Sequence, residues 1–182
     1  MKQCKGTIVF DVDGVLLDFY GTFLTWYNEK HGTAFHTSDL SRYDIASGLN
    51  IDPQEIVDFH AEDACGHLPL LETDAPALLQ RLKGAGYQIV FNTDFPLEHM
   101  EKRHANLAEH ALCYDAIHFR AKEHLIHLYD DIVAVVEDNP KWIRLYAPKM
   151  IVMVPKRPYL DNEELPSNLL WYNTFSDGFR HF

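Results

Sequence analysis

The chain has 182 residues, a length typical of a single domain with room for a modest insertion. Its 27 aspartates and glutamates outnumber its 16 lysines and arginines, so the formal net charge is −11. Surfaces for nucleic acid polymers or anionic membranes need an excess of basic residues, so this balance argues against both. The apolar share of 47% excludes a disordered chain. Its apolar runs are about as long as a strand, far short of the roughly 20 residues that span a bilayer.

The cysteines and the N-terminus give an expectation for the cellular compartment of the protein. Cys4, Cys65 and Cys113 are odd in number and far apart, without a CxxC pattern, so neither a disulfide framework nor a zinc site is expected. The N-terminus lacks the long apolar stretch of a signal peptide. Together these features predict a protein of the reducing cytoplasm, and nothing in the sequence indicates its oligomeric state.

Short, nearly continuous apolar runs recur along the chain and are bounded by polar or turn residues. Such runs are typical of strands buried on both faces of a parallel sheet. Helix-like stretches alternate with them, which predicts an α/β fold with a doubly wound parallel, Rossmann-like sheet. The predicted strands are Thr7–Phe10, Gln88–Phe91, Ile132–Val136 and Met150–Val154, with a weaker run at Ala116–Phe119.

Between and after these strands, capping residues and good helix formers predict the helices. Asp74 is expected to cap a helix that stops at Gly84-Ala85-Gly86, because glycine ends helices readily. Further helices are predicted between Pro96 and Leu112, over Lys122–Tyr129 and over Pro140–Tyr146. The tail from Pro155 is rich in turn residues, and its Trp171 and Phe175 are expected to pack back on the body.

The first connection is unusually long, because 77 residues separate Phe10 from Gln88. One crossover helix needs far fewer. The extra residues have helical signals of their own, over Asp18–Lys30, near Ser38-Asp39 and from Asp52 to about Ala64. We therefore expect a small helical cap inserted after the first strand, with the core at residues 1–17 and 73–182 and the cap at 18–72.

Polar side chains follow three of the predicted strands. In open parallel sheets, ligands bind at the carboxyl ends of the strands, so these residues should meet at one edge. Several carboxylates packed together repel by several kcal/mol at an effective dielectric near 20, so a cation is needed. Oxygen ligands suit Mg²⁺, and Lys122 can supply a second positive charge. The residues concerned are Asp11 and Asp13, then Asn92, Thr93 and Asp94, then Glu137 and Asp138.

Each of these pieces has an ordinary interpretation when taken alone. A DxDG segment is often a turn, a threonine after a strand is often a helix cap, and Lys122 could be a solvated lysine at a helix start. Their joint order is far less common. A strand with DxDG, a strand with threonine, a lysine and a strand with Glu-Asp together indicate a site that handles a phosphoryl group.

On these motifs the chain resembles the haloacid dehalogenase-like hydrolases, from about Thr7 to Val154. The resemblance rests on Asp11-Val12-Asp13-Gly14-Val15, Thr93, Lys122 and Glu137-Asp138. It implies a phosphomonoester hydrolase rather than a dehalogenase, because the family's dehalogenases lack an acid where Asp13 stands.

The resemblance also implies a role for each motif residue. Asp11 would attack phosphorus to give an aspartyl-phosphate, and Asp13 would protonate the leaving oxygen and then activate water. Thr93 and Lys122 would hold the oxygens of the transferring group.

The resemblance further implies a Mg²⁺ cofactor. The Asp11 carboxylate, the Asp13 main-chain carbonyl and Asp138 would bind the ion, with Glu137 in or near the set. Charge neutralisation and positioning are what phosphoryl transfer requires.

The substrate is expected to be a small phosphorylated molecule. The segment from Asp11 to Leu24 is similar to the start of the 5′(3′)-deoxyribonucleotidases, in which the aromatic residue at Phe19 lines the base pocket. We therefore predict a 5′-nucleotidase or deoxyribonucleotidase, with Asn92 and Asp94 also contacting the substrate. Phe19, Phe23, Trp26 and Tyr27 equally fit the apolar face of a helix, with Phe19 the best candidate for the pocket.

Two alternatives stay open. The Glu137-Asp138 pair also occurs in sugar-phosphate members of the superfamily, so a sugar-phosphate phosphatase or a phosphotransferase would use the same chemistry on another substrate. A binding protein that keeps the fold with an idle site is the second alternative, although all the expected chemical groups are present.

Overall fold

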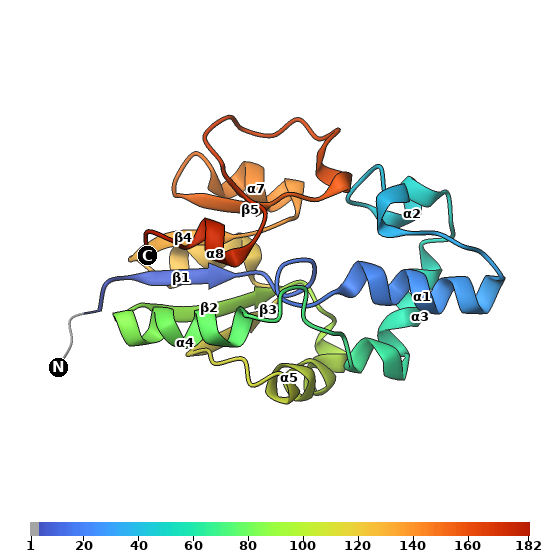
Figure 1. Ribbon diagram of the computed structural model, residues 1–182, viewed down its shortest axis with the longest axis horizontal. Helices are drawn as coiled ribbons and strands as arrows, with labels where there is room; N and C mark the ends of the chain where they lie inside the picture. Colours follow the sequence, from blue (N-terminus) through green and yellow to red (C-terminus); the bar gives the residue numbers. More distant parts are fainter. Residues whose placement is uncertain (1–3) are drawn as a thin grey trace.

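A computed structural model of the chain describes residues 4–182 and contains a single six-stranded sheet. The strand order is β3-β2-β1-β4-β5-β6, and each neighbouring pair is parallel. This confirms the predicted doubly wound α/β fold (Figure 1). Residues 1–3, which the predicted core and the N-terminal argument include, lie outside the described residues. The strands are β1 (Thr7–Phe10), β2 (Gln88–Thr93), β3 (Ala116–Phe119), β4 (Ile132–Val136), β5 (Val152–Pro155) and β6 (Leu170–Tyr172).

The central strands have apolar sequences because they are buried in the sheet. All four residues of β1 are buried, because the strand pairs with β2 on one side and β4 on the other and helices cover its faces. The α-helices are α1 (Phe19–His31), α2 (Ile45–Leu49), α3 (Gln54–Ala61), α4 (Ala75–Ala85), α5 (Met100–Glu109), α6 (Leu125–Leu128), α7 (Pro140–Tyr146) and α8 (Phe175–Gly178). The 3₁₀ turns are η1 (Thr37–Asp39), η2 (Asp63–Gly66), η3 (Leu97–His99), η4 (Lys122–His124) and η5 (Pro158–Leu160).

The inserted helices α1, α2 and α3 lie beyond the end of the sheet toward which β1 points (Figure 1). α1 begins at Phe19 because the Asp18 carboxylate accepts a hydrogen bond from the Gly21 backbone N at 2.8 Å. It ends at Gly32, whose φ of 66° is in the left-handed region that glycine tolerates. The expected insertion of helices after the first strand is therefore present.

Two linkers join this insertion to the sheet and run beside each other. Asp18 N donates to Pro69 O, and Leu71 N donates to Leu16 O, each bond being 2.9–3.0 Å long. The outgoing and returning chains are thereby tied together next to the end of β1. This places the insertion over the carboxyl ends of the strands, where the polar residues were predicted to gather.

The structure corrects several details of the sequence interpretation. Trp171 is 44% exposed and does not anchor the tail, whereas Phe175 is fully buried. Trp171 and its neighbour Leu170 are both exposed on β6, an edge strand that was not predicted because three residues carry little periodic signal. The short helix α2 was also missed. β5 begins at Val152 rather than Met150, and α3 ends at Ala61 before the separate turn η2. Among residues 4–182, no helix is both long enough and apolar enough to cross a bilayer.

Candidate active site

Charged side chains meet where β1, β2 and β4 end. Lys122 Nζ lies 2.7 Å from Asp11 Oδ2 and 2.9 Å from Glu137 Oε2. Asp94 Oδ2 is further away, 3.9 Å from the same nitrogen. Tyr146 donates a hydrogen bond to the Lys122 carbonyl at 2.6 Å, which fixes the start of η4. Separate strand ends and one turn are therefore required to assemble this group.

Burial sets the protonation behaviour of this group. Burial raises the pKa of Asp11 well above its ordinary value, and the Glu137 carboxylate adds to the rise. Burial alone would lower the pKa of Lys122, but Asp11 and Glu137 outweigh it and raise that pKa above the usual lysine range. Lys122 is therefore a cation, and it only partly offsets the crowded carboxylates.

Asp138 is held close to the Asp11 loop by a tyrosine. Tyr159 donates a hydrogen bond to Asp138 Oδ2 at 2.6 Å. Gly14 approaches the same carboxylate so closely that a Cβ atom there would clash with Oδ2, and its φ of 81° favours glycine. Burial and the negative charge of Asp11 raise the pKa of Asp138 to about 8. The DxDG glycine thus has a packing reason as well as a turn conformation.

These residues fit a divalent cation. Asp11, Glu137 and Asp138 each offer an oxygen, and the three oxygens lie within 4.8 Å of one another. Asp138 Oδ1 is buried without a hydrogen-bond partner among the described residues. Both Glu137 oxygens instead accept bonds from Lys122. Buried carboxylates with raised pKa values need more positive charge than Lys122 supplies, and hard oxygen donors suit Mg²⁺.

Asp13 stands apart from this group and has a different cation. Arg103 Nη2 lies 2.7 Å from Asp13 Oδ1, and the arginine side chain is 0% exposed. Thr93 Oγ1 donates to the other oxygen, Oδ2, at 3.3 Å and accepts a hydrogen bond from Phe95 N at 3.1 Å. Asp13 itself is 23% exposed and reaches the open space in front of the strand ends. The two aspartates of the motif are therefore separately paired.

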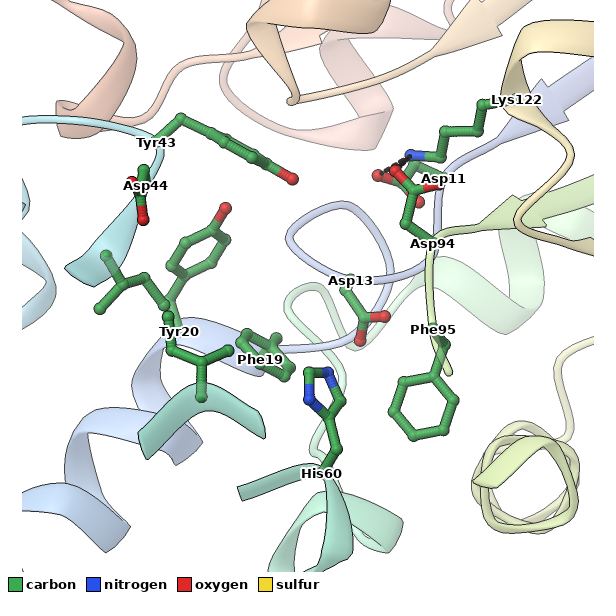
Figure 2. Close-up of a pocket in the computed structure, with 12 residues that line it drawn as sticks. Asp11, Asp13, Phe19, Tyr20, Tyr43, Asp44, His60, Asp94, Phe95 and Lys122 are labelled. Atoms are coloured by element: carbon green, nitrogen blue, oxygen red, sulfur yellow. Dashed lines mark ion pairs between the residues drawn. The ribbon is translucent and has the colours of Figure 1, made fainter. Parts of the chain in front are cut away.

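A cavity of about 350 Å³ lies between the strand ends and the insertion. Its size is that of a small-molecule site. Figure 2 shows Lys122, Asp11 and Asp94 on one side of it and the rings of Phe19, Tyr20, Tyr43 and His60 on the other, where Asp44 also lies. The described residues that line it are Asp11, Asp13, Phe19, Tyr20, Tyr43, Asp44, Ile45, Ile56, His60, Asp94, Phe95 and Lys122.

Two of the three predicted substrate contacts lie at the cavity. Phe19 and Asp94 line the cavity, and Asp94 Oδ2 accepts a hydrogen bond from Trp142 Nε1 at 2.7 Å. Asn92 is 2% exposed and is not among the lining residues. Phe23 is fully buried beside Phe19 and does not line the cavity, whereas Phe19 and Tyr20 do, so α1 supplies both core and cavity wall.

Several residues of the site, among them His60 and Arg103, were not predicted from the sequence. His60 from α3 packs against Phe19 and Phe95, with ring centroids 5.5 and 5.4 Å apart, and burial lowers its pKa. Arg103 also lies over the Phe95 ring, 4.2 Å from the ring centroid. The polar pair Arg103 and Asn106, three positions apart beside Leu107, is a weak signal that one face of α5 is buried and polar.

Comparison with known proteins bears on the fold. No protein-family model matches the chain, and no curated protein matches its sequence. Solved structures do match. A dehalogenase solved as an intermediate complex has a TM-score of 0.65 and 16% identity, over 97% of this chain and 96% of that one. A HAD family hydrolase from Deinococcus radiodurans R1, with bound phosphate and sodium, has a TM-score of 0.61 and 16% identity over 84% and 83%.

A D,D-heptose 1,7-bisphosphate phosphatase from Burkholderia thailandensis matches with a TM-score of 0.55 and 14% identity, over 93% of this chain and 92% of that one. The chain spans about half, 47%, of its match in the Pnkp1/Rnl/Hen1 complex. At these identities the likeness concerns the fold alone, which is that of haloacid dehalogenase-like hydrolases. A shared fold can carry many activities, and the activity depends on the residues of the site.

Proposed function

We propose that this chain is a magnesium-dependent phosphomonoester hydrolase of the haloacid dehalogenase-like superfamily, working through an aspartyl-phosphate. The observation that carries the proposal is the pairing of Asp11 with buried Lys122 at 2.7 Å, beside a buried Asp138 oxygen without a partner in the described structure. Residues 1–17 and 73–182 would form the catalytic core, and residues 18–72 the cap that covers it.

The proposed reaction has two steps that use the same two aspartates. An Asp11 oxygen bonds to phosphorus while the ester P–O bond breaks, and Asp13 gives its proton to the departing oxygen. Asp13 then accepts a proton from a water molecule whose oxygen attacks phosphorus. The aspartyl P–O bond breaks, and inorganic phosphate leaves. The Lys122 ammonium and the Thr93 hydroxyl would hold the oxygens on which negative charge develops.

Asp11, the Asp13 main-chain carbonyl and Asp138 would hold Mg²⁺. When bound, the ion would supply positive charge to the phosphate oxygens and offset the carboxylate repulsion. Glu137 has a different task in this proposal. Its two oxygens lie 3.1 and 2.9 Å from Lys122 Nζ, so Glu137 orients the lysine toward Asp11.

The aromatic side of the cavity supports a nucleoside monophosphate as substrate. Phe19, His60 and Phe95 form a group of flat rings near Asp13, where the leaving group would sit. Stacking on an aromatic ring contributes about 1–3 kcal/mol per base. Of the described residues that line the cavity, Lys122 is the only lysine or arginine. A second phosphate on the leaving group would therefore meet no cation there.

A sugar phosphate is the second candidate. Asp94 lines the cavity with 46% of its side chain exposed, so it can accept hydrogen bonds from sugar hydroxyls. Transfer of the phosphoryl group to an alcohol instead of water would make the same site a phosphotransferase.

A phosphatase screen separates these functions. The purified chain is assayed with ribo- and deoxyribonucleoside monophosphates, hexose phosphates and p-nitrophenyl phosphate, with Mg²⁺ or with a chelator. We expect Mg²⁺-dependent phosphate release and the highest kcat/KM for a nucleoside monophosphate. Turnover of sugar phosphates alone would select the second candidate. No turnover of any ester would leave a binding protein with an idle site.

A further inference from the structure

Helix α5 carries a buried arginine whose two terminal nitrogens have different partners. Arg103 Nη2 contacts Asp13 Oδ1 at 2.7 Å, and Nη1 donates to Asn106 Oδ1 at 3.2 Å. The side chain is 0% exposed, so it does not reach the cavity or a substrate. A guanidinium fork that joins two fixed oxygens restricts the orientation of both.

Asn106 is in turn fixed to the linker that returns from the insertion. Its Oδ1 accepts a hydrogen bond from Leu68 N at 3.2 Å, and its Nδ2 donates to Leu68 O at 3.0 Å. Leu68 directly precedes Pro69, whose carbonyl accepts the bond from the outgoing linker at Asp18. One continuous path of contacts thus runs from the linkers through α5 to the Asp13 carboxylate.

The charge and position of Arg103 suit the proposed role of Asp13. Once Asp13 gives its proton to the leaving oxygen, it becomes a carboxylate, and the permanent charge of Arg103 stabilises that form. Arg103 holds Oδ1 at 2.7 Å and Thr93 Oγ1 donates to Oδ2 at 3.3 Å, so the two contacts together fix the orientation of the Asp13 carboxylate. Arg103 keeps its own proton throughout.

We propose that Arg103 is a positioning residue for Asp13, and that Asn106 ties this orientation to the Leu68 linker. This inference rests on the proposed function, because in that function Asp13 acts as the general acid and the general base. It predicts a specific kinetic signature. Loss of Arg103 should slow hydrolysis most where the leaving oxygen needs a proton, and least where the leaving group departs as a stable anion.

The test compares phenyl phosphate, a poor leaving group, with 2,4-dinitrophenyl phosphate, a good one, at saturating Mg²⁺. Arg103→Met should lower kcat for phenyl phosphate at least about 10-fold more than for the dinitrophenyl ester, within the range of general acid catalysis. Arg103→Lys keeps the charge but cannot contact both oxygens, so its loss should fall between Arg103→Met and wild type.

Asn106→Ala serves as a second variant in case the buried arginine cannot be replaced without unfolding. It leaves Arg103 in place and removes the tie to Leu68, so we expect a smaller loss with the same dependence on leaving group. Lys102→Met is the matched control. Lys102 is the neighbouring residue on α5, and its ammonium caps the carbonyls of Ala61 and Glu62 at 2.6 and 3.1 Å without contacting Asp13. The ratio of kcat values for the two esters in Lys102→Met should stay at the wild-type value.

The outcomes are distinct. A loss in the arginine or asparagine variants that is equal for both esters would show a merely structural role and overturn this inference, while leaving the phosphatase intact. Wild-type kinetics in Arg103→Met would also overturn it. Failure of the wild type to hydrolyse either ester would instead overturn the proposed function, and this inference with it.

Discussion

The strand ends and the helical insertion line the same cavity with different chemistry. On the strand side, Asp11, Lys122 and Glu137 are at most 4% exposed and are held by hydrogen bonds of 2.7–3.1 Å. On the insertion side, the rings of Phe19 and His60 pack against each other, and Tyr43 packs against Tyr20. The strand side can hold charge in one geometry, whereas the insertion side selects for shape and flatness. Changes on the first side should affect the chemistry of every substrate, and changes on the second should distinguish among them.

The largest effect is expected at Asp11. Asp11→Asn should reduce turnover of every ester by roughly 10⁴-fold or more, because an amide cannot act as the nucleophile. The fold should remain, since burial already disfavours the ionised carboxylate and Lys122 keeps Glu137 as a partner. Phosphate release and thermal unfolding measure the two quantities. Asp161→Asn, an exposed position, is the control and should change neither. Retention of Mg²⁺-dependent turnover would show that another residue is the nucleophile.

The next largest effect on turnover is expected from substitution of Asp13, which is also on the strand side of the cavity. Asp13→Asn should lower the rate by about 10²–10⁴-fold for substrates with poor leaving groups. The loss should be smaller for p-nitrophenyl phosphate, because nitrophenolate departs without needing a proton. Steady-state kinetics on a nucleoside monophosphate and on p-nitrophenyl phosphate check this. Equal losses on both would argue against Asp13 as the acid.

On the insertion side, substitution of Phe19 should change KM for one class of substrate. If Phe19 stacks on a base, Phe19→Ala should raise KM for nucleoside monophosphates by roughly 5- to 150-fold, the factor that 1–3 kcal/mol implies, and leave sugar phosphates much less affected. Phe23→Ala is the matched control, because Phe23 stacks on Phe19 with centroids 6.4 Å apart but does not line the cavity.

The control should lose about 3–5 kcal/mol of unfolding free energy without changing substrate preference. If Phe19→Ala behaved in the same way as Phe23→Ala, Phe19 would be core rather than a wall of the substrate site.

The smallest expected effect is a dependence of stability on pH and Mg²⁺ at Asp138. Burial and the charge of Asp11 raise its pKa to about 8 in the folded chain, above roughly 3.9 for an unfolded one. The folded state therefore binds a proton that the unfolded chain has released. Without a divalent cation, this contribution to stability is full below about pH 4 and is lost as the pH rises through 8.

Because Mg²⁺ competes with that proton, Mg²⁺ should raise the unfolding temperature more at pH 8 than at pH 5. Thermal unfolding with and without Mg²⁺ at the two pH values measures the difference, and Asp138→Asn should remove most of it. A Mg²⁺ shift that is the same at both pH values, or absent, would remove Asp138 from the cation site.

The sequence alone predicted the positions of the first five strands along the chain, the helical insertion after β1 and a site that combines Asp11, Lys122 and Glu137. These features were readable because each rests on local patterns. Buried parallel strands produce apolar runs, and the carboxyl ends of parallel strands share one edge. α7 begins at Pro140 as predicted, because Asn139 caps it by accepting a hydrogen bond from Lys141 N at 3.0 Å.

Only the tertiary structure decided which residues complete the site. The partner of Asp13 is Arg103, 90 positions away, and the partner of Asp138 is Tyr159, from the segment after β5. His60 faces the cavity only because the two linkers place α3 over the strand ends. A sequence pattern shows that a helix has an apolar face, but it does not show which element that face meets. Pairings across such distances depend on packing that no local period encodes.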